Sequence, residues 1–128
     1  MTTPRAEVLI VDDQPRNLDA LEAMLSPLDC VLVRAETSDE ALLSLLRHDF
    51  AAIVLDIQMP GMNGIEAIKI LRATAQTARV PVIAVTASVM QGDLKRITEA
   101  GFDGYVPKPI NVRKFLDTVR DVLERRTK

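Results

Sequence analysis

Five short apolar runs constrain the fold of this chain more than any other feature of the sequence. Each run is apolar throughout, without polar alternation, and each is followed by a stretch in which apolar residues recur at helical spacing. Strands of this kind form parallel sheets that carry helices on both faces. We therefore predict an α/β protein with five parallel strands, at residues 7–11, 30–36, 51–56, 80–86 and 104–107.

The stretches between the runs predict five helices. Pro15 suits a first helical turn, and Thr37-Ser38 followed by two acidic residues resembles a helix start. In this second helix we expect Leu42, Leu45 and Leu46 to form the apolar stripe. The predicted helices cover 15–25, a segment from 37 onward, 65–75, 93–100 and 112–123.

The strand order follows from the handedness of the crossovers. Right-handed connections between five strands favour a flavodoxin-like, doubly wound sheet in the order 2-1-3-4-5, which places the first strand beside the third. Ligands of such sheets bind beyond the carboxyl ends of the strands, where the order reverses. The first and third strands end in Asp12-Asp13 and Asp56, so we expect these three carboxylates to face one crevice.

Length and composition indicate one domain, residues 1–128 with a core of about 6–125. The formal charge is only -2, which indicates neither a nucleic-acid nor a membrane partner. Cys30 is the single cysteine, and no apolar run is long enough for a signal peptide or a membrane span. We expect a cytoplasmic location.

Three neighbouring carboxylates repel one another unless a cation offsets their charge. Oxygen ligands favour a hard ion, and Mg²⁺, or Mn²⁺ in its place, takes one or two carboxylates and leaves positions for phosphate oxygens. Thr86 and Lys108 follow the fourth and fifth strands and would add a hydroxyl and an ammonium group. An aspartate can act as a nucleophile at phosphorus, and we expect Asp56 to be the residue that is modified.

Four motifs at the strand ends resemble one protein family. The sequence resembles the receiver domain of two-component response regulators, of the single-domain type, over nearly its whole length. The motifs are Val11-Asp12-Asp13, Leu55-Asp56 with Met59-Pro60-Gly61 and Gly64, Val85-Thr86-Ala87, and Val106-Pro107-Lys108-Pro109-Ile110.

The resemblance implies a role for each motif residue. Asp56 would accept a phosphoryl group from a phosphohistidine, and Lys108 would pair with a phosphoryl oxygen. Asp12 and Asp13 would hold Mg²⁺ together with Asp56 and the backbone carbonyl of Gln58.

It also implies how the phosphorylated state is signalled. Thr86 would close onto the phosphoryl group and Tyr105 would move from exposed to buried, while Gln58 and Ser88 match positions that tune hydrolysis. The Lys108–Pro109 peptide bond would be cis.

The resemblance further implies a switch without enzymatic activity beyond its own phosphorylation and dephosphorylation. A histidine kinase or phosphotransfer protein would supply the phosphate, and the face of the fourth helix, fifth strand and fifth helix would contact a downstream protein. Since the sequence ends with the fifth helix, we expect no output domain. The family pattern also allows a phosphorylation-dependent dimer.

Several alternatives stay open at this point. The chain could be a receiver domain excised from a hybrid histidine kinase or multidomain regulator. A phosphatase of the haloacid-dehalogenase type would need an acid at position 58, which is glutamine, and a flavodoxin-like electron carrier would need a Ser/Thr/Gly-rich loop after the first strand. For single residues, Asp13 could be only a helix cap and Tyr105 only a surface residue.

Overall fold

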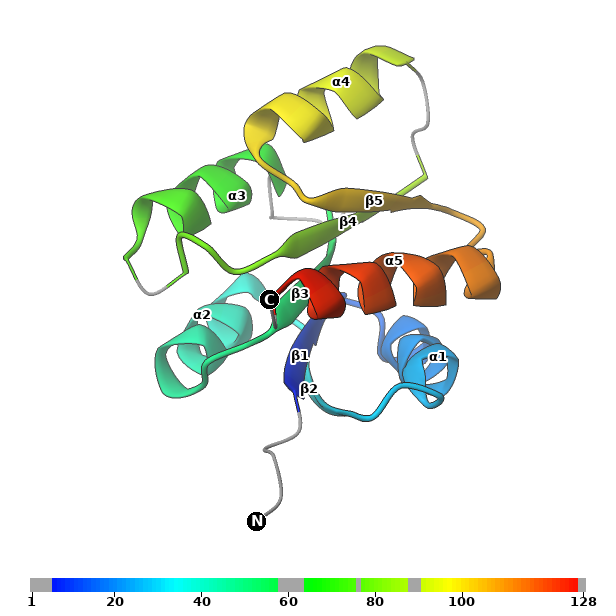
Figure 1. Ribbon diagram of the computed structural model, residues 1–128. Coiled ribbons are helices and arrows are strands. Elements are labelled where there is room, and N and C mark those ends of the chain that lie inside the picture. The colour runs from blue at the N-terminus through cyan, green and yellow to red at the C-terminus, as the bar shows by residue number, and fades with distance from the viewer. Residues whose placement is uncertain (1–5, 58–63, 76, 88–90, 127–128) are drawn as a thin grey trace.

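The computed structural model describes residues 6–57, 64–75, 77–87 and 91–126. Five strands form one sheet in the order β2-β1-β3-β4-β5, and every neighbouring pair is parallel, which confirms the predicted fold and strand order (Figure 1). The strands are β1 (Ala6–Val11), β2 (Cys30–Ala35), β3 (Ala52–Asp56), β4 (Val82–Thr86) and β5 (Gly104–Pro107).

Five helices cover the two faces of this sheet. Figure 1 shows α1 and α5 on one side, and α2, α3 and α4 on the other. Each face has its own hydrophobic core: the first contains buried residues of α1 and α5, the second buried residues of α2, α3 and α4. The helices are α1 (Pro15–Leu25), α2 (Ser38–Arg47), α3 (Gly64–Ala73), α4 (Gln91–Ala100) and α5 (Val112–Arg126).

The apolar character of the strands is explained by these two cores. Successive side chains of a strand point to opposite faces. Thus Ile53 and Leu55 of β3 join the core under α2, α3 and α4, whereas Ala52 and Val54 join the core under α1 and α5. A polar residue at any of these positions would be buried, which is why the strands show no alternation.

Local capping fixes where α1 and α2 begin. The N-cap of α1 is Gln14, whose side chain makes no capping hydrogen bond, so Asp13 is not the cap that the alternative reading required. At α2, the Thr37 hydroxyl accepts a hydrogen bond from the Glu40 backbone N–H (3.1 Å), as the sequence predicted. The Glu40 carboxylate in turn accepts one from the backbone N–H of Glu36 (2.7 Å).

Four boundaries differ from the prediction by two or three residues. β4 begins at Val82 and not at Val80, because Pro81 has no N–H for the sheet, although its carbonyl accepts from Ile53 N–H (2.9 Å). α3 ends at Ala73, α4 begins at Gln91, and α5 continues through Arg126.

The predicted apolar stripe of α2 is wrong for two of its three leucines. Leu45 packs against the core, but Leu42 is 49% and Leu46 67% exposed. Ala41 is the buried residue of α2, and Leu45 lies one turn after it. The helix therefore turns its Ala41–Leu45 row to the sheet, and Leu42 and Leu46 lie about 100° around the helix from that row.

At the amino ends of the strands, Arg72 of α3 holds three segments together. Its guanidinium donates to the carbonyls of Gly101 (2.8 Å) and Val80 (2.6 Å) and to the Asp103 carboxylate (2.7 Å). The same Asp103 oxygen accepts from the Val82 backbone N–H (2.8 Å). Gly101 has φ +112, a left-handed conformation that favours glycine, and it ends α4 as predicted.

Among the described helices, none combines the length and the apolar composition that crossing a bilayer requires.

Candidate phosphoryl-acceptor site

Three aspartates meet at the carboxyl ends of β1 and β3. Val11 is paired with Leu55 in the sheet register, so the residues that follow them, Asp12 and Asp56, lie side by side. One carboxylate oxygen from each of Asp12, Asp13 and Asp56 lies within 4.8 Å of the others. Asp12 is 2% and Asp56 5% exposed, and Asp13 is half-buried. The structure thus brings together the three acids that the sequence placed in one crevice.

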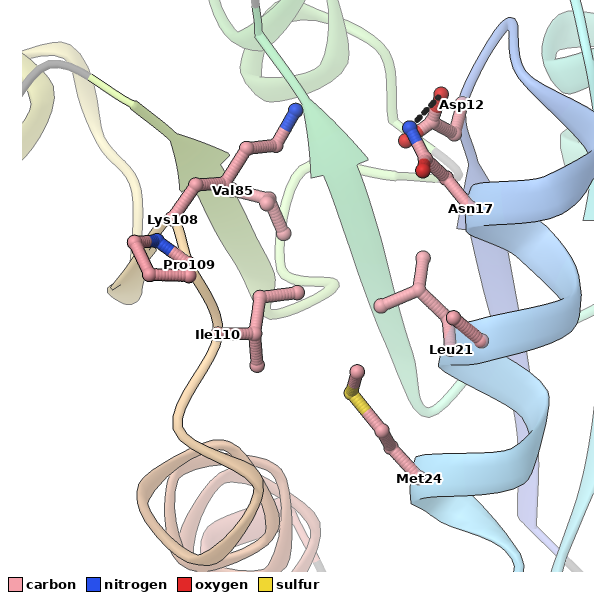
Figure 2. A pocket seen from close by; sticks show the side chains of 9 residues that line it. Asp12, Asn17, Leu21, Met24, Val85, Lys108, Pro109 and Ile110 are labelled. Carbon is pink, nitrogen blue, oxygen red and sulfur yellow. Dashed lines mark hydrogen bonds between the residues drawn. The ribbon is translucent and has the colours of Figure 1, made fainter.

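Two hydrogen bonds orient the Asp12 carboxylate at the start of α1. Its Oδ1 accepts from the backbone N–H of Gln14 (2.9 Å) and from the side-chain amide of Asn17 (3.3 Å), the bond drawn in Figure 2. Sequence reasoning missed Asn17. Its signal was available, since a polar residue in the first turn after a strand-end aspartate is within reach of that carboxylate.

The electrostatics of Asp12 reflect this crowding. Burial raises the pKa of the Asp12 carboxyl, and the nearby negative charge of Asp56 raises it further. The hydrogen bonds from Gln14 and Asn17 and the positive charge of Lys108 act in the opposite direction without cancelling the rise. The folded protein therefore holds this carboxylate in a setting that disfavours its negative charge.

Lys108 brings a positive charge to the opposite side of the cluster. In the register of β4 and β5, Thr86 is paired with Pro107, and the Lys108 backbone N–H donates to the Thr86 carbonyl (2.9 Å). This places the Lys108 ammonium 3.0 Å from Oδ2 of Asp56, to which it donates a hydrogen bond. The Lys108–Pro109 peptide bond is cis, as the resemblance implied.

Thr86 and Tyr105 lie on the two neighbouring strands. Thr86 is buried at the end of β4, one residue beyond Val85, which is paired with Asp56. Tyr105 lies in β5 and is 41% exposed. A threonine at the site edge and an exposed aromatic side chain on the next strand suit the predicted pair of switch residues, whose roles stay predictions.

The other predicted residues lie outside the described part of the chain. They are Gln58, assigned to metal binding and hydrolysis, Ser88, assigned to hydrolysis, and the motif Met59-Pro60-Gly61. Gly64 is described as the first residue of α3.

A pocket of about 220 Å³ adjoins Asp12 between α1 and the segment that follows β5. Figure 2 shows Asp12 and the Lys108 ammonium at one end and Leu21, Met24 and Ile110 at the other. A ligand or protein that approaches here meets charged groups and an apolar surface together.

The donor set fits a hard divalent cation. All three clustered groups are carboxylates, and the cluster contains neither histidine nor cysteine. Oxygen ligands of this kind suit Mg²⁺, which keeps several waters and is readily shared with a phosphate group. A cation would also favour the ionised form of Asp12, which the protein alone disfavours.

The fold and the site define a class of protein: a doubly wound α/β domain whose acidic pocket fits a phosphoryl acceptor. The sequence pattern described as "Response regulator receiver domain" matches residues 8–120. The chain belongs to this family of signalling switches.

Named relatives agree with this assignment. The chain is 34% identical over 116 residues to the polar-differentiation response regulator DivK of Brucella ovis, covering 91% of this chain and 94% of that protein. The chemotaxis protein CheY4 of Vibrio cholerae has a similar structure (TM-score 0.85, 27% identity, 93% and 99% of the two chains). So does the receiver domain of the sensor histidine kinase PA1611 of Pseudomonas aeruginosa (TM-score 0.83, 30% identity, 94% and 99%), which was solved with a magnesium ion coordinated in its active-site cleft.

Proposed function

We propose that Asp56 accepts a phosphoryl group from a phosphohistidine of a histidine kinase or histidine phosphotransfer protein. An oxygen of Asp56 attacks phosphorus, the new O–P bond gives an acyl phosphate, and the P–N bond breaks with its electron pair returning to the imidazole. Lys108, which already contacts Asp56 at 3.0 Å, pairs with a phosphoryl oxygen. The observation that carries the proposal is the meeting of three carboxylates and one ammonium at a single sheet edge.

Asp12, Asp13 and Asp56 would hold Mg²⁺ or Mn²⁺, with the backbone carbonyl of Gln58 as a further ligand. The ion supplies charge neutralisation between the carboxylates and the incoming phosphoryl oxygens. Asn17 keeps Asp12 turned toward the cluster through its 3.3 Å hydrogen bond. The magnesium ion in the PA1611 receiver domain, 30% identical to this chain, supports the choice of metal.

The response to phosphorylation passes through Thr86 and Tyr105. Thr86 moves its hydroxyl onto the phosphoryl group, and Tyr105 fills the space that Thr86 leaves, which changes the surface of α4, β5 and α5 for a downstream protein. Gln58 and Ser88 set the lifetime of the acyl phosphate.

We further propose that residues 1–128 act as one receiver unit in the cytoplasm. It catalyses only its own phosphorylation and dephosphorylation and binds proteins, without contacts to nucleic acid or membrane. The formal net charge of only -2 supports the absence of nucleic-acid and membrane contacts. The donor protein contacts the pocket beside α1, where the half-buried Met24 and Ile110 offer apolar surface next to the acceptor.

Phosphorylation of Asp56 is tested with acetyl phosphate and Mg²⁺ and read by intact mass. We expect one added phosphoryl group on the wild type, none on Asp56→Asn, and none on the wild type after chelation of the metal. Asp19→Asn is the matched control, because Asp19 is an exposed aspartate of α1 paired with Arg34. Equal labelling of Asp56→Asn and Asp19→Asn would reject Asp56 as the acceptor.

Lys108→Ala tests whether the Lys108 ammonium is needed for the activated conformation. This variant removes the ammonium that pairs with the phosphoryl oxygen, so we expect a folded protein that fails to acquire the activated conformation. The measurement is the chemical-shift change of β5 and α5 amides on addition of beryllofluoride and Mg²⁺. Lys114→Ala, a change of an exposed lysine of α5, serves as the control. A full activated spectrum from Lys108→Ala would remove Lys108 from the mechanism.

A further inference from the structure

An apolar groove of about 230 Å³ lies between α2 and α3. The strands β1 and β3 form its floor, and the two helices form its banks. None of the residues that line it belongs to the acidic cluster. The lining includes Leu9, Val11, Ile53 and Leu55 from the floor, Ala41, Leu42 and Leu45 from α2, and Ala67, Ile70 and Leu71 from α3.

Large aliphatic side chains are exposed on the two helices that border this groove. Leu42, Leu43 and Leu46 of α2 and Ile70 of α3, which we name the α2–α3 patch, are 49%, 53%, 67% and 59% exposed. They make up four of the seven exposed large hydrophobic residues in the described part of the chain. Single exposed apolar residues are ordinary, but a group of this size on two adjacent helices marks an interaction surface.

The charges on the two helices are separated by sign. α2 carries Asp39 and Glu40 in its first turn and Arg47 in its last, and α3 carries Glu66 in its first turn and Arg72 in its last. Both helices run in the same direction, since each connects two strands of a parallel sheet. The Arg72 guanidinium is already bound to Val80, Gly101 and Asp103. The charges that can face a partner are therefore those of α2, with Asp39 and Glu40 exposed at the aspartate end and Arg47 exposed at the other end.

This pattern is complementary to itself when one copy is turned by a twofold rotation. The rotation makes the two α2 helices antiparallel and sets Asp39 of each copy opposite Arg47 of the other. The midpoint of Asp39 and Arg47 is residue 43, and the midpoint of Leu42 and Leu46 is residue 44. One axis near the middle of α2 thus pairs both the charges and the leucines, whereas a parallel arrangement would oppose like charges.

We propose that a second copy of this chain docks on the α2–α3 patch and forms a twofold dimer. Leu46 of each copy packs over Leu42 of the other, and Leu42 lines the groove together with Ile70. Helices of ten residues are about 15 Å long, so the interface is at the small end of specific interfaces, near 1,000 Å² in total. We expect dissociation constants on the order of 10 to 100 µM.

The apolar contact is tested by sedimentation equilibrium of the full chain over a wide concentration range. The wild type should shift from monomer to dimer, and Leu46→Glu should weaken association at least tenfold. Val112→Glu is the matched control, because Val112 is also exposed (44%) but lies on α5, and its association should equal that of the wild type. Circular dichroism melts confirm that each variant is folded. A wild type that stays monomeric at about 1 mM, or two variants that associate equally, would overturn the proposal.

The antiparallel arrangement is tested by exchanging charges. Asp39→Arg and Arg47→Glu should each weaken association, and the double variant Asp39→Arg/Arg47→Glu should restore it, since the opposed charges are then reversed together. If the double variant associates less than either single variant, the twofold arrangement is wrong.

The dimer should form equally in Asp56→Asn, because the patch shares no residue with the acceptor site. This separates the proposal from the phosphoryl function: loss of labelling leaves the dimer intact, and loss of the dimer leaves labelling intact. A monomeric wild type whose Leu42 and Ile70 methyl signals shift only when another protein is added would assign the groove to that protein and overturn self-association.

Discussion

Clustered charged side chains lie at both ends of the strands, which we call the amino edge and the carboxyl edge of the sheet, but the two clusters are satisfied in opposite ways. At the amino edge, the Arg72 guanidinium donates to Gly101, Val80 and Asp103, and Asp103 also accepts from Val82. At the carboxyl edge, Asp12, Asp13 and Asp56 lie within 4.8 Å of one another, and Lys108 contacts Asp56 at 3.0 Å. The first arrangement is complete without a ligand, and the second concentrates negative charge.

This difference indicates what each edge contributes. Removing Arg72 from its network leaves partly buried carbonyl groups without their donor and destabilises the fold. Removing one of several like charges relieves repulsion and stabilises the fold, at the expense of the site's function. The network at the amino edge therefore holds α3 and α4 to the sheet. The carboxyl edge carries excess negative charge, which favours the binding of a cation and, with it, a phosphoryl group.

The largest expected effect is on the amino edge. Arg72→Ala removes the guanidinium from the Gly101 and Val80 carbonyls and leaves the Asp103 carboxylate without its cation, so we expect the free energy of unfolding to fall by about 2 to 3 kcal/mol. Urea denaturation followed by circular dichroism measures it. Arg79→Ala is the control, because Arg79 is exposed, and its effect should stay within about 0.5 kcal/mol. If the two variants lose equal stability, the network has no special role.

A smaller effect of opposite sign is expected at the carboxyl edge. Asp12→Asn keeps an oxygen that can accept from Gln14 N–H but removes a buried charge beside Asp56, so the metal-free protein should gain roughly 1 kcal/mol. The stabilisation that Mg²⁺ gives the wild type should be lost in this variant. Thermal melts in chelator and in Mg²⁺ measure both effects, with Asp19→Asn as the neutral-to-slightly-destabilising control. A metal-free Asp12→Asn that is less stable than the wild type would contradict the assigned repulsion.

These two edges also differ in how far the sequence predicts them. The acidic cluster was predictable, because parallel strands bring their carboxyl ends to one edge and the sequence marks four of these five ends with an aspartate, a threonine or a lysine. The Arg72 network was not, because two of its acceptors are the backbone carbonyls of Val80 and Gly101. Every residue has a carbonyl, so no side-chain pattern identifies which ones a distant arginine will reach.

The sequence also could not predict which face of α2 is turned to the sheet, for a related reason. Leu42, Leu45 and Leu46 occupy one broad helical face, and periodicity defines that face only to within about one residue. The short side chain of Ala41 lets α2 approach the sheet with its Ala41–Leu45 row, so Leu46 is left exposed. Because α2 buries Ala41, Leu42 and Leu46 stay exposed and form part of the patch to which we assign the dimer.

The smallest expected effect is the pH dependence of the carboxyl edge in the absence of metal. The folded-state pKa of Asp12 is raised by burial and by Asp56, so between the unfolded value near 3.9 and that raised pKa the native state binds more protons than the unfolded state. The stability of the wild type relative to Asp12→Asn should therefore fall as pH rises through this window and stay constant above it. Below the unfolded pKa, Asp12 is protonated in both states, so the destabilisation caused by its buried negative charge is absent. Urea midpoints of both proteins in chelator, from acidic to neutral pH, test the sign of this pH dependence. If Asp12→Asn becomes more stable relative to the wild type toward acidic pH, repulsion at Asp12 is not the source of the stability difference.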